Sequence, residues 1–287
     1  MDNGSQDGSV SRIKEYAEEK KIKISEYTLD EVENRKLKGL NDNLEYDSCY
    51  HFILIKSSEN HGFAEGNNIG IRFALDYLDP DYILLLNNDT VVDVNFLDGM
   101  VKLAETDEKI GILGPKVYYY DKPDVINSAG VKMNWRLGVG NNIGIKEVDN
   151  GQFEDILELD SLIGACLLIK SSVFKKIGLM DGKFFLLLEE TDFCFRARIN
   201  DFKIIFFPKS KIYHKEGFSG KLNPESLYYR SRNRLFLIRK HQPVKRTIIY
   251  TILISIEAIM NSLIYGVKGE FESSKAIIKG HFDGLKY

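Results

Sequence analysis

The chain has 287 residues, 44% of them hydrophobic and 28% charged, so it is long enough to bury a sizeable core. Its formal net charge of −3 gives no general attraction to nucleic acid, and no nucleic-acid partner is expected. Cys49, Cys166 and Cys194 are far apart and lack CxxC spacing, which argues against a disulfide framework and a zinc site. With no signal-peptide pattern at the start, we expect a reducing, cytoplasmic location.

The sequence opens on a polar, glycine-rich turn, DNGSQDGS at residues 2–9, followed by helical spacing of apolar residues from Ile13 to Ala17. Turns of this composition usually follow a strand, and we expect that strand to lie upstream of Met1. A charged stretch then leads to a short buried strand at Phe52–Ile55.

The next segment, from Glu59 to Gly70, is rich in glycine and asparagine and precedes a helix expected over Ile69–Leu78. Gly62 and Gly66 allow close approach to the backbone, and the amides at a helix N-terminus suit a phosphate or a sugar. The glycine spacing alone is a weak signal.

The run Ile83–Leu86 is apolar without alternation, which predicts a strand buried on both faces of an α/β sheet. It ends at Asn87-Asn88-Asp89, where ligands bind in open α/β sheets. Asn87 and Asp89 lie two apart on an extended segment, so both can point at one Mg²⁺ or Mn²⁺ ion. A polar loop that merely ends a core strand is the alternative.

The middle of the chain alternates helices and strands. We expect a helix over Phe96–Ala104, strands over Ile110–Pro115 and Leu162–Ile169, and a helix over Ser171–Ile177. Residues 116–158 have no clear periodicity and form either the floor of a substrate cleft or a meander of short strands.

A second polar cluster follows the apolar run Phe184–Leu188. Glu189, Glu190 and Asp192 crowd before a helix expected over Phe193–Ile199, an arrangement that is unfavourable unless a cation, a proton or water relieves it. A further strand, Phe202–Phe207, leads to His214, which is either a structural histidine or a metal ligand.

The last sixty residues differ in character. Residues 228–241 are rich in arginine and aromatic residues, and residues 247–265 are largely apolar. Ser255, Glu257 and Asn261 disfavour a membrane-spanning helix. The segment is typical of contact with a membrane surface, or of a helix that packs on the core or on a second subunit of a homo-oligomer.

Five motifs, taken together and in this order, resemble those of inverting family 2 glycosyltransferases of the GT-A fold, above all the rhamnosyltransferase-like branch. They are DNGSQDGS at 2–9, NHGFAEGNNIG at 60–70, the DXD-type NND at 87–89, EETDFC at 189–194 and YH at 213–214. The pattern of that family begins with a further strand and helix, which we expect ahead of Met1.

The resemblance implies a role for each matching residue. Asp2 contacts the nucleotide, and the donor also meets residues of the second and third motifs, namely Asn60, Gly66, Asn67, Asn87 and Asn88. Asn87, Asp89 and His214 hold Mg²⁺ or Mn²⁺. Glu190 is the general base, although the family usually has Asp there, and Asp192 is the second candidate.

We therefore expect an α/β fold of the GT-A, Rossmann-like type, with a mostly parallel sheet flanked by helices. Residues 1–227 would form the catalytic domain and residues 228–287 a helical tail. The expected reaction moves a sugar, with rhamnose one candidate, from a UDP- or dTDP-sugar to a hydroxyl of a glycan or glycolipid, at the inner face of the plasma membrane. A phosphatase with a nucleophilic strand-end Asp is disfavoured because residue 87 is Asn. A non-catalytic binding or membrane-associated subunit is the remaining alternative.

Overall fold

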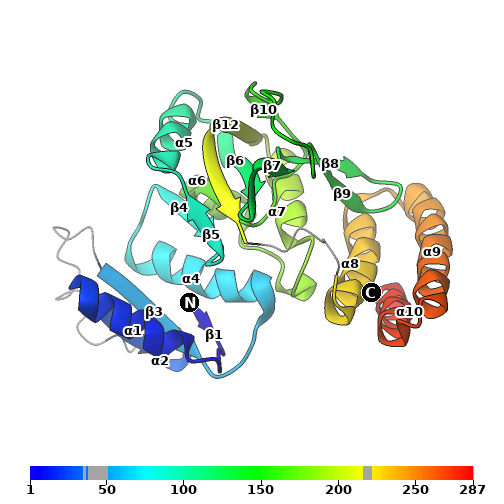
Figure 1. Ribbon diagram of the computed structural model, residues 1–287, viewed down its shortest axis with the longest axis horizontal. Coiled ribbons are helices and arrows are strands. Elements are labelled where there is room, and N and C mark those ends of the chain that lie inside the picture. Colours follow the sequence, from blue (N-terminus) through cyan, green and yellow to red (C-terminus); the bar gives the residue numbers. More distant parts are fainter. Residues whose placement is uncertain (35–36, 38–50, 216–221, 287) are drawn as a thin grey trace. The chain divides into compact units, whose positions relative to one another are not determined.

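The computed structural model describes residues 1–34, 37, 51–215 and 222–286. They form two compact units, Met1–Asp79 and Pro80–Tyr287 (Figure 1). Cys49 lies outside the described residues. The predicted boundary between residues 227 and 228 lies within the second unit and stays a prediction.

The first unit is a small α/β layer with a parallel sheet in the order β1-β3-β2. Its elements are β1 (Asp2–Asn3), α1 (Ser9–Lys20), β2 (Lys23–Thr28), α2 (Leu29–Glu33), β3 (His51–Ser57) and α4 (Gly62–Tyr77). Tyr27 and Ile55 from the strands pack against Ile69 and Phe73 from α4. Helix α4 begins seven residues earlier than we predicted, at Gly62 instead of Ile69.

The second unit is larger and mixes strands with helices. Up to the acidic cluster it contains β4 (Tyr82–Leu86), β5 (Thr90–Val92), α5 (Phe96–Ala104), β6 (Ile110–Tyr119), β7 (Lys122–Ser128), β8 (Val131–Asn134), β9 (Val139–Asn142), β10 (Leu157–Glu158), β11 (Cys166–Lys170) and α6 (Ser171–Ile177). It continues with a 3₁₀ turn (Gly182–Phe184), α7 (Glu189–Arg198), β12 (Lys203–His214), α8 (Pro224–His241), α9 (Val244–Val267) and α10 (Phe271–Lys286).

The main sheet of this unit has the order β10-β12-β6-β11-β4, with β5 added to β12 and β7 added to β6. Among the described strand pairs of this sheet, β6–β12 alone runs parallel and the others are antiparallel. The prediction of an α/β fold with a helical C-terminal segment is confirmed, but the description "mostly parallel" holds only for the first unit. Residues 116–158 include the short strands β7, β8, β9 and β10, and tight turns join the antiparallel pairs β6–β7 and β8–β9.

Strand β4 also differs from the expectation of burial on both faces. Ile83 and Leu85 are buried, whereas Leu86 is 40% exposed. In the described chain β4 pairs with β11 alone and lies at the end of the sheet order. Tyr82 and Leu84, on its less buried face, are only partly buried but still pack against the core of this unit.

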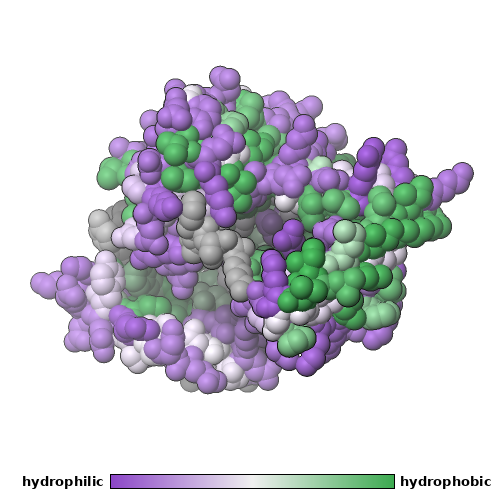
Figure 2. Space-filling model, turned by 45° about the vertical axis from the view of Figure 1, so that its right-hand side comes forward, coloured by the Kyte–Doolittle hydropathy of each residue, from purple (hydrophilic) through white to green (hydrophobic). Residues whose placement is uncertain are grey.

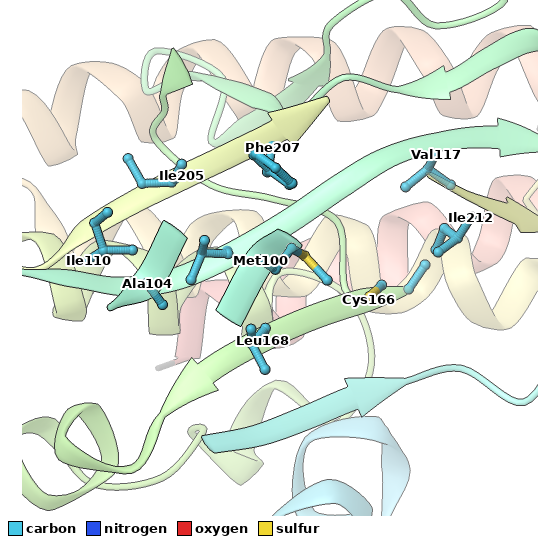
Figure 3. Close-up of a cluster of buried hydrophobic side chains, with 11 residues drawn as sticks. Met100, Ala104, Ile110, Val117, Cys166, Leu168, Ile205, Phe207 and Ile212 are labelled. Carbon is cyan, nitrogen blue, oxygen red and sulfur yellow. The ribbon is translucent and has the colours of Figure 1, made fainter. Parts of the chain in front are cut away.

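The core of the second unit lies between α5 and the central strands. Met100 and Ala104 of α5 cover side chains from β6, β11 and β12, as Figure 3 shows. Cys166 belongs to this core, and Cys194 is fully buried on α7. Burial raises the pKa of both thiols to about 12, so neither is a reactive thiolate.

The three C-terminal helices pack closely, and small residues permit the closest contact. A Cβ atom added at Gly280 of α10 would lie 2.2 Å from the carbonyl oxygen of Tyr228 on α8. Gly266 on α9 has only the Ser274 hydroxyl nearby, at 3.8 Å from an added Cβ. Gly280 is therefore required by packing, whereas Gly266 is not.

Two glycine substitutions test this packing. Gly280→Ala should destabilise the second unit by about 1–3 kcal/mol, because α8 and α10 must separate to accept the methyl group. Gly266→Ala should be neutral or raise stability by about 0.5–1 kcal/mol, because alanine favours the helix and meets open space. Urea unfolding of both variants measures the two effects. Equal stabilities of the two variants would contradict the packing of α8 against α10.

Candidate functional site

The turn after β4 is fixed by its own backbone. The Asn87 amide donates to the Ala165 carbonyl (3.0 Å), and the Asn87 carbonyl accepts from the Thr90 amide (3.3 Å) and hydroxyl (2.7 Å). Asn88 is exposed, and Asp89 is half-buried. The backbone therefore turns sharply here and presents Asp89 at the start of β5.

His214 reaches this turn from the far end of β12. Strand β12 pairs with β5 so that His214 stands opposite Thr90, and the Lys215 amide donates to the Asp89 carbonyl (2.8 Å). The His214 Nε2 atom consequently lies 3.2 Å from Asp89 Oδ1. Two residues that the sequence singled out separately are thus brought into contact by strand pairing.

The donor set fits a divalent cation of the Mg²⁺ or Mn²⁺ type. Asp89 Oδ1 is buried and accepts no hydrogen bond within the described residues. Among those residues no group of three or more His, Cys, Asp or Glu side chains could hold a metal ion by itself. A pair of protein ligands, completed by phosphates and water, is the usual arrangement for Mg²⁺ at a phosphate-binding site. The ligand role of Asn87 stays a prediction.

The acidic cluster follows an irregular turn. Phe185, Leu187 and Leu188 all have positive φ, at 62°, 70° and 73°. That conformation is costly for side chains larger than glycine and persists only where surrounding contacts fix it. Helix α7 then begins at Glu189, four residues earlier than predicted.

The fixing contacts come from α8. The buried Asn233 side chain donates to the carbonyls of Phe184 (2.9 Å), Leu186 (2.8 Å) and Leu187 (2.8 Å). Arg232 donates to the carbonyls of Lys183 (2.6 Å) and Phe184 (2.9 Å). Neither residue was predicted as functional, because an Asn or Arg within a basic helix gives no sign of a distant partner.

The side chains of Glu189 and Glu190 are largely shielded from solvent. Glu189 is buried, and its Oε2 atom has no hydrogen-bond partner within the described residues. Burial, together with the neighbouring charge of Glu190, raises the pKa of Glu189 well above its usual range, and burial also raises the pKa of Glu190. Glu190 is the less enclosed of the two as a residue, and the Thr191 hydroxyl donates to it (3.3 Å). A carboxylate with a raised pKa is a better proton acceptor near neutral pH.

Asp192 lies two residues after Glu190 on α7 and has a different environment. Its fully buried carboxylate contacts Arg196 Nε (2.8 Å), Lys240 Nζ (2.9 Å) and His241 Nε2 (2.7 Å). Burial alone would raise the pKa of Asp192, but the His241 hydrogen bond and the two cations outweigh it and lower that pKa to about 2. Such a carboxylate is a weak proton acceptor, so its contacts favour a role in attaching α7 to α8.

In the first unit, Asn3 joins the first two motifs. Its Nδ2 atom donates to the Asn60 side chain (3.0 Å) and to the Gly62 carbonyl (2.9 Å), and its Oδ1 atom accepts from the His61 amide (2.9 Å). A Cβ atom added at Gly66 would lie 3.0 Å from Asn3 Nδ2. Asn60 and Gly66 are therefore brought together through Asn3, a residue that we quoted in the motif but did not assign to the site.

The remaining predicted donor residues have local partners. The Asp2 carboxylate accepts from the Ser5 amide (3.4 Å), and the Asn67 side chain donates to the Phe63 carbonyl (2.8 Å) one turn earlier in α4. Asp2 still has free acceptor capacity, whereas the Asn67 amide is partly used by its own helix. Their donor-binding roles stay predictions.

Comparison with known proteins gives a family match to most of this chain. The family described as Glycosyltransferase like family 2 matches residues 52–235. A low-salt glycan biosynthesis hexosyltransferase of Haloferax volcanii is 28% identical over 177 residues, which make up 60% of this chain and 54% of that protein. The chain thus spans about half the length of that relative. A dTDP-rhamnosyl transferase of Shigella flexneri is 27% identical over 271 residues, 89% of this chain and 85% of that protein.

Among solved structures, a mannosyltransferase of Pyrobaculum calidifontis, in complex with GDP-Man and Mn²⁺, is similar in fold. The match covers 99% of this chain and 76% of that one, with a TM-score of 0.51 and 10% identity. At this identity the likeness concerns the fold alone, and it confirms the predicted GT-A type.

Protonation of Asp192 should cost stability in acid. Because its folded pKa is lowered to about 2, the stabilisation is present above the unfolded value of about 3.9 and is lost as the pH falls through the folded value. Asp192→Asn should therefore be less stable than the unsubstituted chain at pH 7, by roughly 2–3 kcal/mol or more. This difference should shrink between about pH 5 and pH 2. Denaturant unfolding across that range tests it, with the exposed Asp155→Asn as control; a difference independent of pH would contradict the network.

Proposed function

The chain belongs to glycosyltransferase-like family 2, and on that premise we propose that it transfers a sugar from a nucleotide-diphosphate donor to a hydroxyl acceptor. The observation that carries the proposal is the contact between Asp89 and His214, 3.2 Å apart at the end of two paired strands. These two side chains would hold a Mg²⁺ or Mn²⁺ ion, with Asn87 as a third candidate ligand. When bound, that ion neutralises the charge that develops on the leaving diphosphate.

The donor itself would be bound by residues of the first three motifs. Asp2 offers a carboxylate to the nucleotide, and Asn60, Gly66 and Asn67 offer amides and open backbone to the phosphates or the sugar. Asn88 is exposed beside the metal-binding pair and is free to contact the donor. The organisation of Asn60 and Gly66 around Asn3 supports this assignment, because a pre-formed turn loses little entropy on binding.

Glu190 would be the general base. The attacking hydroxyl must lose a proton as it forms a bond to the anomeric carbon, and a raised pKa lets the carboxylate accept that proton near neutral pH. Attack from the side opposite the leaving diphosphate, in one displacement, inverts the anomeric centre. Asp192 would act by positioning, since its carboxylate already contacts three basic side chains.

The name of the Shigella relative favours dTDP-rhamnose as the first donor to test, with UDP-sugars next. The acceptor would be a glycan or glycolipid of the cell surface, and the enzyme would act in the cytoplasm at the inner face of the plasma membrane. A non-catalytic binding subunit is less favoured, because such a protein has no need of the strained turn that presents Glu190.

The metal-binding pair can be tested by donor binding. Asp89→Ala should abolish Mn²⁺-dependent binding of a sugar nucleotide, and His214→Ala should weaken it, because each removes one of the two protein ligands. Calorimetry with dTDP-rhamnose and UDP-sugars, with and without Mn²⁺, measures the effect, and the exposed Asp98→Ala is the matched control. Unchanged metal dependence in both Asp89→Ala and His214→Ala would rule the assignment out.

The general base can be tested by transfer kinetics. Glu190→Gln should lower the rate of transfer by at least about 10²-fold and leave donor affinity within a few-fold, because the base acts on the acceptor hydroxyl. Glu190→Asp, which restores the usual residue of the family, should keep substantial activity. As the raised pKa of Glu190 implies, transfer by the unsubstituted enzyme should fall in acid at a higher pH than an ordinary Glu would give.

The competing assignments have distinct outcomes in the same assay. An active Glu190→Gln with an inactive, folded Asp192→Asn would make Asp192 the base. Full transfer activity in both variants would mean that the acidic cluster is only the start of a helix.

A further inference from the structure

A pocket of about 820 Å³ is lined by the β8–β9 hairpin and the beginning of α9. Three of its side chains are cationic, Lys132, Arg136 and Arg246, and two are aromatic, Trp135 and Tyr250. No Asp or Glu of the described residues lines it. The charge of its walls therefore suits an anionic ligand.

The three cations have no competing partner in the described chain. Within residues 1–34, 51–215 and 222–286, no carboxylate forms an ion pair with Lys132, Arg136 or Arg246. Arginine guanidinium groups recognise phosphate oxygens through paired hydrogen bonds, and lysine does so as a point charge. An anion bound here would meet three charges without displacing any internal ion pair.

In the basic segment 228–241, from which we expected membrane attraction, three of the cations form contacts within the protein. Arg234 pairs with Glu257 (2.5 Å), Arg239 donates to the Gly284 carbonyl (2.7 Å), and Lys240 contacts Asp181 (2.7 Å). These side chains hold α8 to its neighbours, because a helix packed on several sides must satisfy its polar groups internally. Three cations that form no ion pair within the described residues, Lys132, Arg136 and Arg246, line the pocket instead.

Helix α9 carries a continuous exposed apolar face beside this pocket. Figure 2 shows hydrophobic residues gathered over the C-terminal helices. On α9 they recur at helical spacing and are at least 46% exposed: Ile248, Ile249, Ile252, Ile256, Ile259, Met260, Leu263, Ile264 and Val267. An exposed patch of this kind marks an interaction surface.

The polar residues of α9 lie on its packed side. Glu257 pairs with Arg234, Ser262 contacts Ser274 (2.8 Å) and Ser255 contacts His281 (3.0 Å). The single carboxylate of α9 is thus neutralised inside the helical packing. The exposed face consequently presents apolar side chains, with cations at its beginning.

Among the described residues, α9 alone has the length and mean hydropathy, 1.8, of a membrane span. It packs, however, along α8 and α10, whose charged side chains would have to enter the hydrocarbon with it. A helix with one packed side and one apolar side instead lies in the plane of the interface.

We propose that the pocket binds the phosphate of an anionic lipid headgroup while the exposed face of α9 lies in the same membrane leaflet. Arg246 and Tyr250 line the pocket, and Ile248, Ile249 and Ile252 occupy the same two turns of α9, so headgroup and acyl chains meet adjoining surfaces. Trp135 and Tyr250 provide the aromatic rings typical of the membrane interface. This inference rests on the proposed function and specifies its membrane partner as an anionic lipid bound at this pocket.

A second copy of the chain is the rival occupant of the apolar face. Burial of α9 in a dimer would use its apolar residues but would leave the three unpaired cations of the pocket without counter-charge. The lipid phosphate satisfies both features at once, which is why we assign the membrane.

Vesicle sedimentation tests the proposal with matched charge removals. Binding of the whole chain is compared on phosphatidylcholine vesicles and on phosphatidylcholine vesicles containing phosphatidic acid. Lys245 precedes Arg246 on α9, is exposed and does not line the pocket. Lys245→Ala should weaken binding about fivefold, the usual loss for one cation near an anionic surface. Arg246→Ala and Arg136→Ala should each weaken it more than about tenfold, because each loses a direct phosphate contact. Equal losses in all three variants would overturn the headgroup site.

Further experiments test the apolar face and distinguish the lipid from a free anion and from a second copy of the chain. Ile256→Asn should abolish binding to both kinds of vesicle, and retained binding would overturn the role of the apolar face. Inorganic phosphate, titrated by calorimetry, should bind too weakly to displace the protein from vesicles; tight binding without vesicle association would make the ligand a free anion. A doubled mass by light scattering that Ile256→Asn halves, with no vesicle binding, would assign the face to a second copy.

Thermal unfolding of each variant confirms that it is folded. No arm of the test uses a sugar nucleotide, so failure of the headgroup site and failure of the proposed transferase activity are observed in separate experiments.

Discussion

Glu190 keeps its place only while the carbonyls of residues 184–187 are held, and the Asn233 side chain binds three of them. The turn has residues at positive φ that do not favour that conformation by themselves, so its shape depends on α8. Asp192 strengthens the same junction, because its carboxylate joins α7 to Lys240 and His241 at the end of α8. The acidic residues of α7 and the basic helix α8 therefore depend on each other. Burial raises the pKa of Glu190, whereas the basic partners of Asp192 lower the pKa of Asp192.

A different constraint organises the metal-binding pair. Asp89 and His214 come together because β5 is only three residues long and pairs with the last residues of β12. β12 itself shifts register between Phe207 and Lys211, around Pro208, before it reaches His214. Both halves contribute to the core, through Phe207 and Ile212, and the second half also carries His214. The packing of Phe207 and the position of His214 are thus linked through one strand.

Much of this was predictable where the signal is local. The carboxylates, the NND turn and the glycine-rich segment were recognised because their residue types and spacing carry the chemistry. The start of α4 at Gly62 was missed because glycine and asparagine disfavour helices. In the structure, Asn68 and Arg72 both donate to the Glu65 carboxylate and stabilise the first turns of α4. Asn233 and Asn3 were missed for another reason: their partners are distant in sequence, and nothing in either side chain's own neighbourhood signals them. The strand directions of the second unit were predicted wrongly for the same reason, because strand pairing depends on residues that are distant in sequence.

The dependence of the acidic turn on α8 affects how the polypeptide could be shortened. A protein ending before Pro224 would retain the NND turn, His214 and the whole acidic motif, and a motif search would still recognise it. It would nevertheless lose Asn233, Lys240 and His241, so the carbonyls of Leu186 and Leu187 would lose the Asn233 donor. The buried Asp192 carboxylate would keep only Arg196 of its three basic partners. Such a truncated chain would resemble the enzyme in sequence while lacking the support of its active turn, so the minimal autonomous unit must include the C-terminal helices.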